Sequence, residues 1–167
     1  MSGTRKDFAA TLVLVRHAAA KPATPGQSDF DRELTDGAAE PLGDLGIEIF
    51  FTAFATAVFS SPAKRTFTTA CEIANGYGLT PPETDERLYQ AAADTLREFA
   101  FRKLNEDESP IIVAHNPGIS LFASQLAGVT VRFAPAGWAA FGFDGEESLS
   151  GRRLPEVIEI NEDWADR

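Results

Sequence analysis

Two short apolar segments of this chain each end at a histidine, and this shared pattern limits how the chain can fold. Residues 11–15 are followed by Arg16 and His17, and residues 111–114 are followed by His115. Short apolar runs rich in β-branched residues are typical of strands buried on both faces of a sheet. In open α/β sheets, ligands bind at the carboxyl ends of such strands. Both histidines are therefore predicted to lie at the ligand-binding edge of one sheet.

The remaining segments supply the other elements of an α/β fold. Further strands are predicted for residues 53–60, 138–143 and 154–160, with the last two antiparallel at the edge of the sheet. Helices are predicted for residues 36–51, 62–74, 92–104 and 118–127. The first of these helices is weak, because it contains Gly37, Pro41, Gly43 and Gly46. No repeat or linker divides the chain, and residues 1–167 are expected to form a single domain.

Two helices begin with residues that suit an anion site. Ser61 is predicted to be an N-cap and Pro62 the first helical residue, which places Arg65 in the first turn. Asn116 and Pro117 repeat this pattern directly after His115. The backbone N–H groups at a helix N-terminus attract anions.

Composition excludes several classes of partner. Fifteen Lys and Arg against 25 Asp and Glu give a net charge of −10, which disfavours nucleic acid and anionic membranes. No apolar run is long enough to span a membrane, and residues 1–10 lack the apolar core of a secretory signal. The single cysteine, Cys71, fits a reducing compartment, so a cytoplasmic location is expected.

Two imidazoles and two guanidiniums at strand and helix ends suit a tetrahedral oxyanion such as phosphate. Arg16 and Arg65 can hold its oxygens, while one histidine acts as nucleophile and the other donates a hydrogen bond. A zinc site lacks further ligands at suitable spacing. A serine triad lacks the Gly-x-Ser-x-Gly turn, and no Lys-Ser/Thr phosphate loop is present.

Three ordered motifs resemble those of the histidine phosphatase superfamily, which is phosphoglycerate mutase-like. They are Leu-Val-Arg-His-Ala at residues 14–18, Ser-Pro-Ala-Lys-Arg with Thr-Thr-Ala at residues 61–70, and Val-Ala-His-Asn-Pro-Gly at residues 113–118. The third motif, the Arg-Glu-Leu-Thr segment at residues 32–35, the Leu-Tyr pair at 88–89 and the short length most resemble small bacterial phosphohistidine phosphatases.

The resemblance implies a three-layer α/β/α sandwich with a mostly parallel sheet, an antiparallel edge strand and no large cap insertion. It also implies that His17 becomes transiently phosphorylated. Arg16, Arg65 and His115 would hold and stabilise the transferring phosphoryl group. Arg32 and Asn116 would bind substrate. No metal and no organic cofactor are expected from the resemblance.

Two positions depart from the family pattern. The usual glycine after the first histidine is Ala18, which is tolerated if its φ angle is negative. Many members carry a proton-donating glutamate where this chain has Gln90. Loss of a general acid commonly costs about 10²- to 10⁴-fold, so ordinary phosphomonoesters should be poor substrates unless Glu86 or Asp94 supplies the proton.

The missing acid favours phosphohistidine, because its departing imidazole is already a good leaving group. The expected function is therefore a phosphatase acting on a phosphorylated protein of the histidine-containing phosphotransfer type. A phosphomonoesterase or pyrophosphohydrolase for small phosphate compounds is the alternative enzyme. A non-catalytic phosphate-binding module is the alternative from another class.

Overall fold

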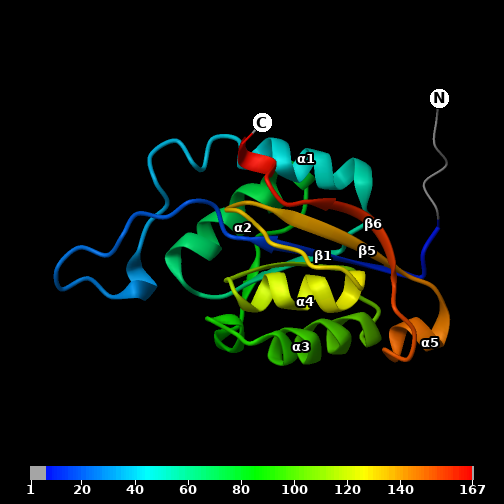
Figure 1. Cartoon of the computed structure of the whole chain (residues 1–167). Coiled ribbons are helices and arrows are strands. Elements are labelled where there is room, and N and C mark those ends of the chain that lie inside the picture. Colours follow the sequence, from blue (N-terminus) through cyan, green and yellow to red (C-terminus); the bar gives the residue numbers. More distant parts are fainter. Residues whose placement is uncertain (1–6, 167) are drawn as a thin grey trace.

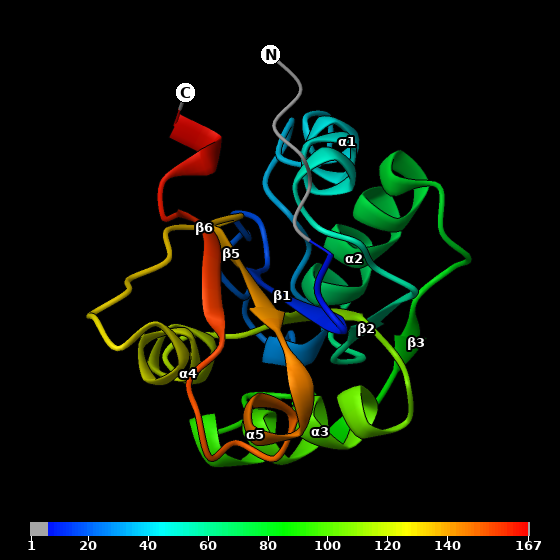
Figure 2. The same ribbon diagram turned by 90° about the vertical axis from the view of Figure 1, so that its right-hand side faces the viewer.

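The computed structural model describes residues 7–166 as a six-stranded sheet between two layers of helices (Figures 1 and 2). The strands are β1 (Ala10–Arg16), β2 (Ala57–Ser60), β3 (Glu83–Thr84), β4 (Pro110–Ala114), β5 (Trp138–Phe143) and β6 (Glu156–Asn161). The helices are α1 (Leu42–Thr52), α2 (Lys64–Tyr77), α3 (Ala93–Asn105), α4 (Gly118–Ala127) and α5 (Gly145–Leu149). Short 3₁₀ turns are η1 (Asp29–Asp31), η2 (Glu86–Leu88) and η3 (Trp164–Asp166).

Residues 1–6 and 167 lie outside the described part of the chain, so the structure does not bear on the expectation that no secretory signal is present. Between residues 7 and 166, no helix is both long and apolar enough to cross a membrane.

The strand order is β3-β2-β4-β1-β5-β6. Strands β3, β2, β4 and β1 run parallel to one another, β5 is antiparallel to β1, and β6 is antiparallel to β5. The predicted α/β class, with a mostly parallel sheet and antiparallel pairing toward one edge, is therefore confirmed. The central pair of parallel strands, β1 and β4, is the pair that carries the two histidines.

The two faces of β1 pack into separate cores. Leu12 and Leu14 join the core under α3 and α4, whereas Val13 and Val15 join the core under α1 and α2. All four side chains are fully buried, as the apolar sequence of this strand predicts. Figure 2 shows the two helical layers on opposite sides of the sheet.

One glycine of the predicted helix 36–51, Gly46, has a packing role together with Gly76 of α2. The helix begins only at Leu42, because the residues before it form turns. A Cβ atom on Gly46 would collide with the backbone of α2, and one on Gly76 would collide with the backbone of Gly43. These glycines therefore let α1 and α2 approach each other closely, at the cost of intrinsic helix stability.

Candidate active site

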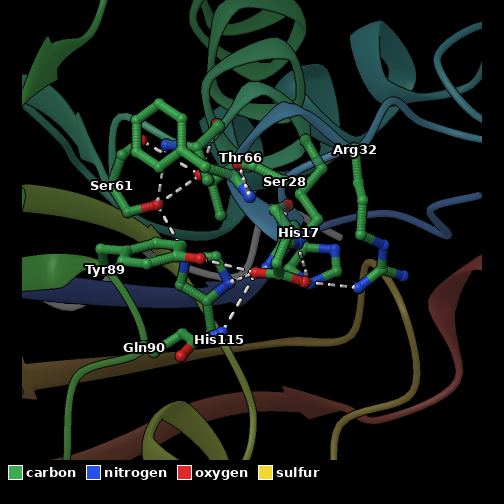
Figure 3. A network of polar contacts seen from close by, with 12 residues as sticks. His17, Ser28, Arg32, Ser61, Thr66, Tyr89, Gln90 and His115 are labelled. Carbon is green, nitrogen blue, oxygen red and sulfur yellow. Dashed lines mark hydrogen bonds and ion pairs between the residues drawn. The ribbon is translucent and has the colours of Figure 1, made fainter. Parts of the chain in front are cut away.

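The two histidines meet at the carboxyl edge of the sheet. Arg16 of β1 pairs in register with Ala114 of β4, so His17 and His115 follow side by side. The backbone N–H of His17 donates to the carbonyl of Ala114 over 3.2 Å. The ring centroids of the two histidines are 5.4 Å apart in an edge-to-face arrangement. The predicted meeting of the two imidazoles is thus observed, and Figure 3 shows both rings pointing into one polar cluster.

The ring of His17 presents an unprotonated nitrogen to the site. Its Nδ1 lies 2.7 Å from the carbonyl oxygen of Ala18 and must donate there, which leaves the lone pair on Nε2. That nitrogen faces Nε of Arg65 at 3.4 Å. Burial lowers the pKa of His17 to about 4, and the nearby guanidiniums of Arg65, Arg16 and Arg32 act in the same direction. The imidazole is therefore neutral near pH 7.

Arg65 connects the two imidazoles from the first turn of α2. Its side chain is 3% exposed, and its Nη2 lies 3.3 Å from Nδ1 of His115. The predicted position of Arg65, close to both histidines, is therefore observed. A buried guanidinium between two neutral rings is a strong attractor of anions.

Ser61 holds the second histidine. Its Oγ lies 2.7 Å from Nε2 of His115 and 2.5 Å from Oγ1 of Thr66. The prediction that Ser61 caps the following helix is wrong, because α2 begins at Lys64 and its N-cap residue is Ala63. The buried imidazole engages the hydroxyl instead. Burial lowers the pKa of His115 to about 3, with His17 and Arg65 as further causes.

Arg16 and Asn116 share a contact on the loop before β5. Arg16 Nη1 donates to the carbonyl of Phe133 over 2.9 Å, and Asn116 Nδ2 donates to the same oxygen over 3.0 Å. Asn116 Oδ1 also accepts from Ser120, while Pro117 takes the N-cap position of α4. Asn116 therefore fixes this loop, and its binding of substrate stays a prediction. Nε of Arg16 is buried without a partner among the described residues, as a donor awaiting an anion would be.

The structure adds a carboxylate that the sequence motifs do not reveal. Asp29 Oδ2 accepts from Arg65 Nη2 over 2.9 Å, from Tyr89 Oη over 2.7 Å and from Gln90 Nε2 over 3.1 Å. Its Oδ1 accepts from Arg32 Nη1 over 3.0 Å. These hydrogen bonds, led by that of Tyr89, hold the pKa of Asp29 well below its ordinary value. Asp29 is therefore ionised, and its partners Tyr89, Gln90 and Arg32 are labelled in Figure 3.

Local sequence offers one signal for Asp29. Ser28 caps the 3₁₀ turn η1 by accepting from the N–H of Phe30, and this turn places Asp29 three residues before Arg32. A Ser-Asp-x-x-Arg pattern in a loop after a candidate nucleophile could have indicated a structured acidic residue. Its partners at Arg65 and Tyr89 come from distant segments, and the pattern does not encode them.

The structure shows the backbone conformation of Ala18 and Gln90, the two positions that depart from the family pattern. Ala18 is not among the non-glycine residues with positive φ, so the expectation that it replaces glycine without strain is confirmed. Gln90 has a φ of 47°, in the left-handed region, and its amide turns toward Asp29. Glu86 and Asp94 are both exposed. Across residues 7–166, no group of three or more His, Cys, Asp or Glu residues could hold a metal ion.

Several proteins of known structure resemble this chain. The chain resembles SixA of Agrobacterium tumefaciens, a provisionally named phosphohistidine phosphatase, at 23% identity over 91% of this chain and 97% of that one, with a TM-score of 0.73. It also resembles the protein histidine phosphatase SixA in complex with tungstate, at 17% identity over 94% and 99% of the chains and a TM-score of 0.78. A phosphoserine phosphatase mutant (H9A) from Entamoeba histolytica, in complex with phosphoserine, matches at 17% identity over 91% and 96%, with a TM-score of 0.65.

At these identities the structural likeness shows a shared fold. No curated protein matches the sequence significantly. The family profile of the histidine phosphatase superfamily (branch 1) matches residues 12–114, which is more than half of the chain. The protein therefore belongs to the histidine phosphatase superfamily.

Proposed function

We propose that this protein removes the phosphoryl group from phosphohistidine on another protein, through a phosphorylated intermediate on His17. The observation that carries the proposal is the lone pair of His17 Nε2, which faces a buried guanidinium 3.4 Å away with His115 beside it. A neutral imidazole next to fixed positive charge is suited to attack an anionic phosphorus centre.

The first step forms a bond between His17 Nε2 and phosphorus and breaks the bond to the leaving group. Arg65 and the unpaired Nε of Arg16 hold the phosphoryl oxygens. His115 holds Arg65 toward the phosphoryl oxygens, because its Nδ1 accepts from Arg65 Nη2 over 3.3 Å while its Nε2–H donates to Ser61 Oγ. In the second step water attacks phosphorus, which releases phosphate and restores neutral His17.

The leaving-group side favours a phosphoramidate over an ester. An alkoxide needs a proton as it departs, and the Tyr89 hydroxyl is already engaged in a hydrogen bond to Asp29. Gln90 carries an amide, and Asp29 is ionised because its pKa lies well below the ordinary value. The exposed Glu86 and Asp94 form no hydrogen bond with either catalytic imidazole. Imidazole departs without such help.

A site with an exposed outer residue suits a phosphorylated histidine presented on a protein surface. The Asp29 side chain is 39% exposed, whereas the Arg65 side chain that it contacts is 3% exposed. We propose that the chain acts as one domain in the cytoplasm on phosphotransfer proteins. One structural relative bears the name of phosphohistidine phosphatase and another that of protein histidine phosphatase, which supports this substrate class.

The alternative is hydrolysis of small phosphate esters, because a phosphoserine phosphatase shares the fold. Incubation with ³²P-labelled phosphohistidine protein should label the enzyme at His17, and His17→Ala should abolish the label. Steady-state kcat/KM should be higher for phosphohistidine than for p-nitrophenyl phosphate and far higher than for glycerol phosphate. Equal or faster turnover of the esters would favour the alternative, and absence of any phosphoenzyme would favour a binding module.

A further inference from the structure

Asp29 lies between the buried anion site and solvent. Its carboxylate covers Arg65 Nη2, which is the guanidinium nitrogen that also faces His115. A substrate enters from the solvent side, so its phosphoryl group must take this nitrogen from Asp29. The displaced carboxylate stays close to Arg65, because Arg32 binds its other oxygen and Ser28 caps the turn that carries it.

A carboxylate over Arg65 is placed to meet the leaving group rather than the phosphorus. His17 is buried at the sheet edge, 9% exposed, and in-line displacement places the leaving group opposite the nucleophile. Tyr89 and Gln90 donate to Asp29 from the segment after η2, and the Tyr89 ring centroid lies 5.4 Å from that of His115. The leaving group therefore departs past a fixed negative charge.

We propose that Asp29 recognises the ring N–H of the phosphorylated imidazole and so determines the preference for phosphohistidine. This inference rests on the proposed function and names the residue that selects the substrate class. A phosphohistidine carries the phosphoryl group on one ring nitrogen and can carry a proton on the other. The ionised carboxylate accepts a hydrogen bond from that N–H and stabilises the positive charge of the protonated ring.

The proton and the electrons balance in this step. The lone pair of His17 Nε2 forms the new P–N bond, while the electrons of the substrate P–N bond return to the leaving nitrogen. The protonated substrate ring becomes a neutral imidazole that keeps its N–H on Asp29. His17 becomes a phosphorylated imidazolium whose Nδ1–H remains on the Ala18 carbonyl. No general acid is required, which fits an amide at Gln90.

The neighbours of Asp29 fit this role. A glutamate at position 90 would place a second carboxyl group beside Asp29 Oδ2 and raise the pKa of one of the pair, whereas the Gln90 amide donates a hydrogen bond there over 3.1 Å. Ester substrates offer no ring N–H to the carboxylate. Metabolites with a second anionic group near the phosphoryl are repelled by it.

The test compares two substrates on the same preparation of Asp29→Asn. The ratio of kcat/KM for phosphohistidine to that for p-nitrophenyl phosphate should fall about 10- to 100-fold, the usual effect of losing a charge-assisted hydrogen bond. Asp31→Asn is the matched control, because Asp31 lies in the same turn and is exposed. Its ratio should equal that of the wild type. An unchanged ratio in Asp29→Asn, or an equal fall in Asp31→Asn, overturns the proposal.

The ratio does not depend on the folded fraction, so partial misfolding of a variant does not affect it. Asp29→Ala provides a second variant with the same criterion, and Asp29→Glu should recover part of the preference because it restores the charge. Failure of the proposed function is distinguished by the wild type. If the wild type lacks activity toward phosphohistidine, both proposals fail; if it has activity and the ratio is unchanged in the variants, only the role of Asp29 fails.

Discussion

Ser61 Oγ lies 2.7 Å from Nε2 of His115 and 2.5 Å from Oγ1 of Thr66. The Ser61 hydroxyl therefore determines which ring nitrogen of His115 carries the proton. Thr66 Oγ1 donates to the carbonyls of Ser61 and Ala63, so the Ser61 hydroxyl donates to Thr66 and accepts from His115 Nε2–H. His115 Nδ1 then carries the lone pair and accepts from Arg65 Nη2 over 3.3 Å. Ser61 is therefore expected to fix the tautomer of His115 that holds Arg65 in place.

Ser61→Ala should lower kcat about tenfold, the equivalent of ~1.4 kcal/mol, because His115 loses the partner that fixes its tautomer. Phosphoenzyme formation followed by rapid quench measures this rate. Ser60→Ala is the control, since Ser60 is equally buried but donates to the carbonyl of Ser61 and not to a histidine. Equal losses in the two variants would point to a general packing defect.

The two histidines should titrate far below the ordinary value. Their pKa values are lowered to about 4 for His17 and about 3 for His115, chiefly because burial disfavours the charged ring. They are the only histidines in the chain, so NMR titration with His17→Gln assigns both signals. A pKa near 6.5 for either ring would contradict the buried, neutral site.

The same shift predicts how stability depends on pH. Between pH 6.5 and 4, His17 is protonated in the unfolded chain but stays neutral in the native protein. The free energy of unfolding therefore falls as the pH falls. Between pH 7 and pH 5 this contribution is at most about 2 kcal/mol. Urea denaturation at both pH values should show a smaller fall for His17→Gln than for the wild type.

Gln90→Glu should give the enzyme activity toward esters. The new carboxyl group would lie beside Asp29, and two adjacent carboxylates raise the pKa of one of them, which then carries a proton. A general acid on the leaving-group side should raise kcat for glycerol phosphate by about 10²-fold, the low end of the usual range. Gln90→Leu has a similar size but no proton, and it should leave that rate unchanged.

Gly118→Ala should destabilise the protein by about 1–3 kcal/mol. A Cβ atom there would collide with the backbone carbonyl of Ala91, which pushes α4 away from the segment that carries Tyr89. Gly43→Ala is the contrasting variant, because nothing lies within 4 Å of its added Cβ and alanine favours helix. Urea denaturation should show a loss for the first and a gain of about 0.5–1 kcal/mol for the second.

The sequence predicted the parts of the site that depend on local patterns. His17 and His115 were placed correctly because a buried apolar strand that ends in a polar residue exposes that residue at a sheet edge. Arg65 followed from its distance to the helix start. Asp29 was not predicted, because its position depends on contacts with Arg65 and Tyr89. These residues lie 36 and 60 positions away in the chain.

Two local predictions failed for a related reason. Ser61 and Asn116 have the chemistry of helix caps, but the folded chain gives their side chains other partners. Ser61 binds His115, and Asn116 Nδ2 donates to the carbonyl of Phe133 over 3.0 Å. In both places a tertiary hydrogen bond replaces the local one, and no propensity scale contains that information.

The pairing of Arg16 with Ala114 has a consequence for when the folding chain becomes active. His17, the proposed nucleophile, and His115 are nearly one hundred positions apart in the chain, and the alignment of β1 beside β4 brings them together. Sliding one strand by a single residue would turn its side chains to the opposite face and separate the two rings. Partly folded molecules without this pairing would therefore be inactive. A measurement of phosphoryl transfer thus reports whether β1 and β4 have paired in the correct register.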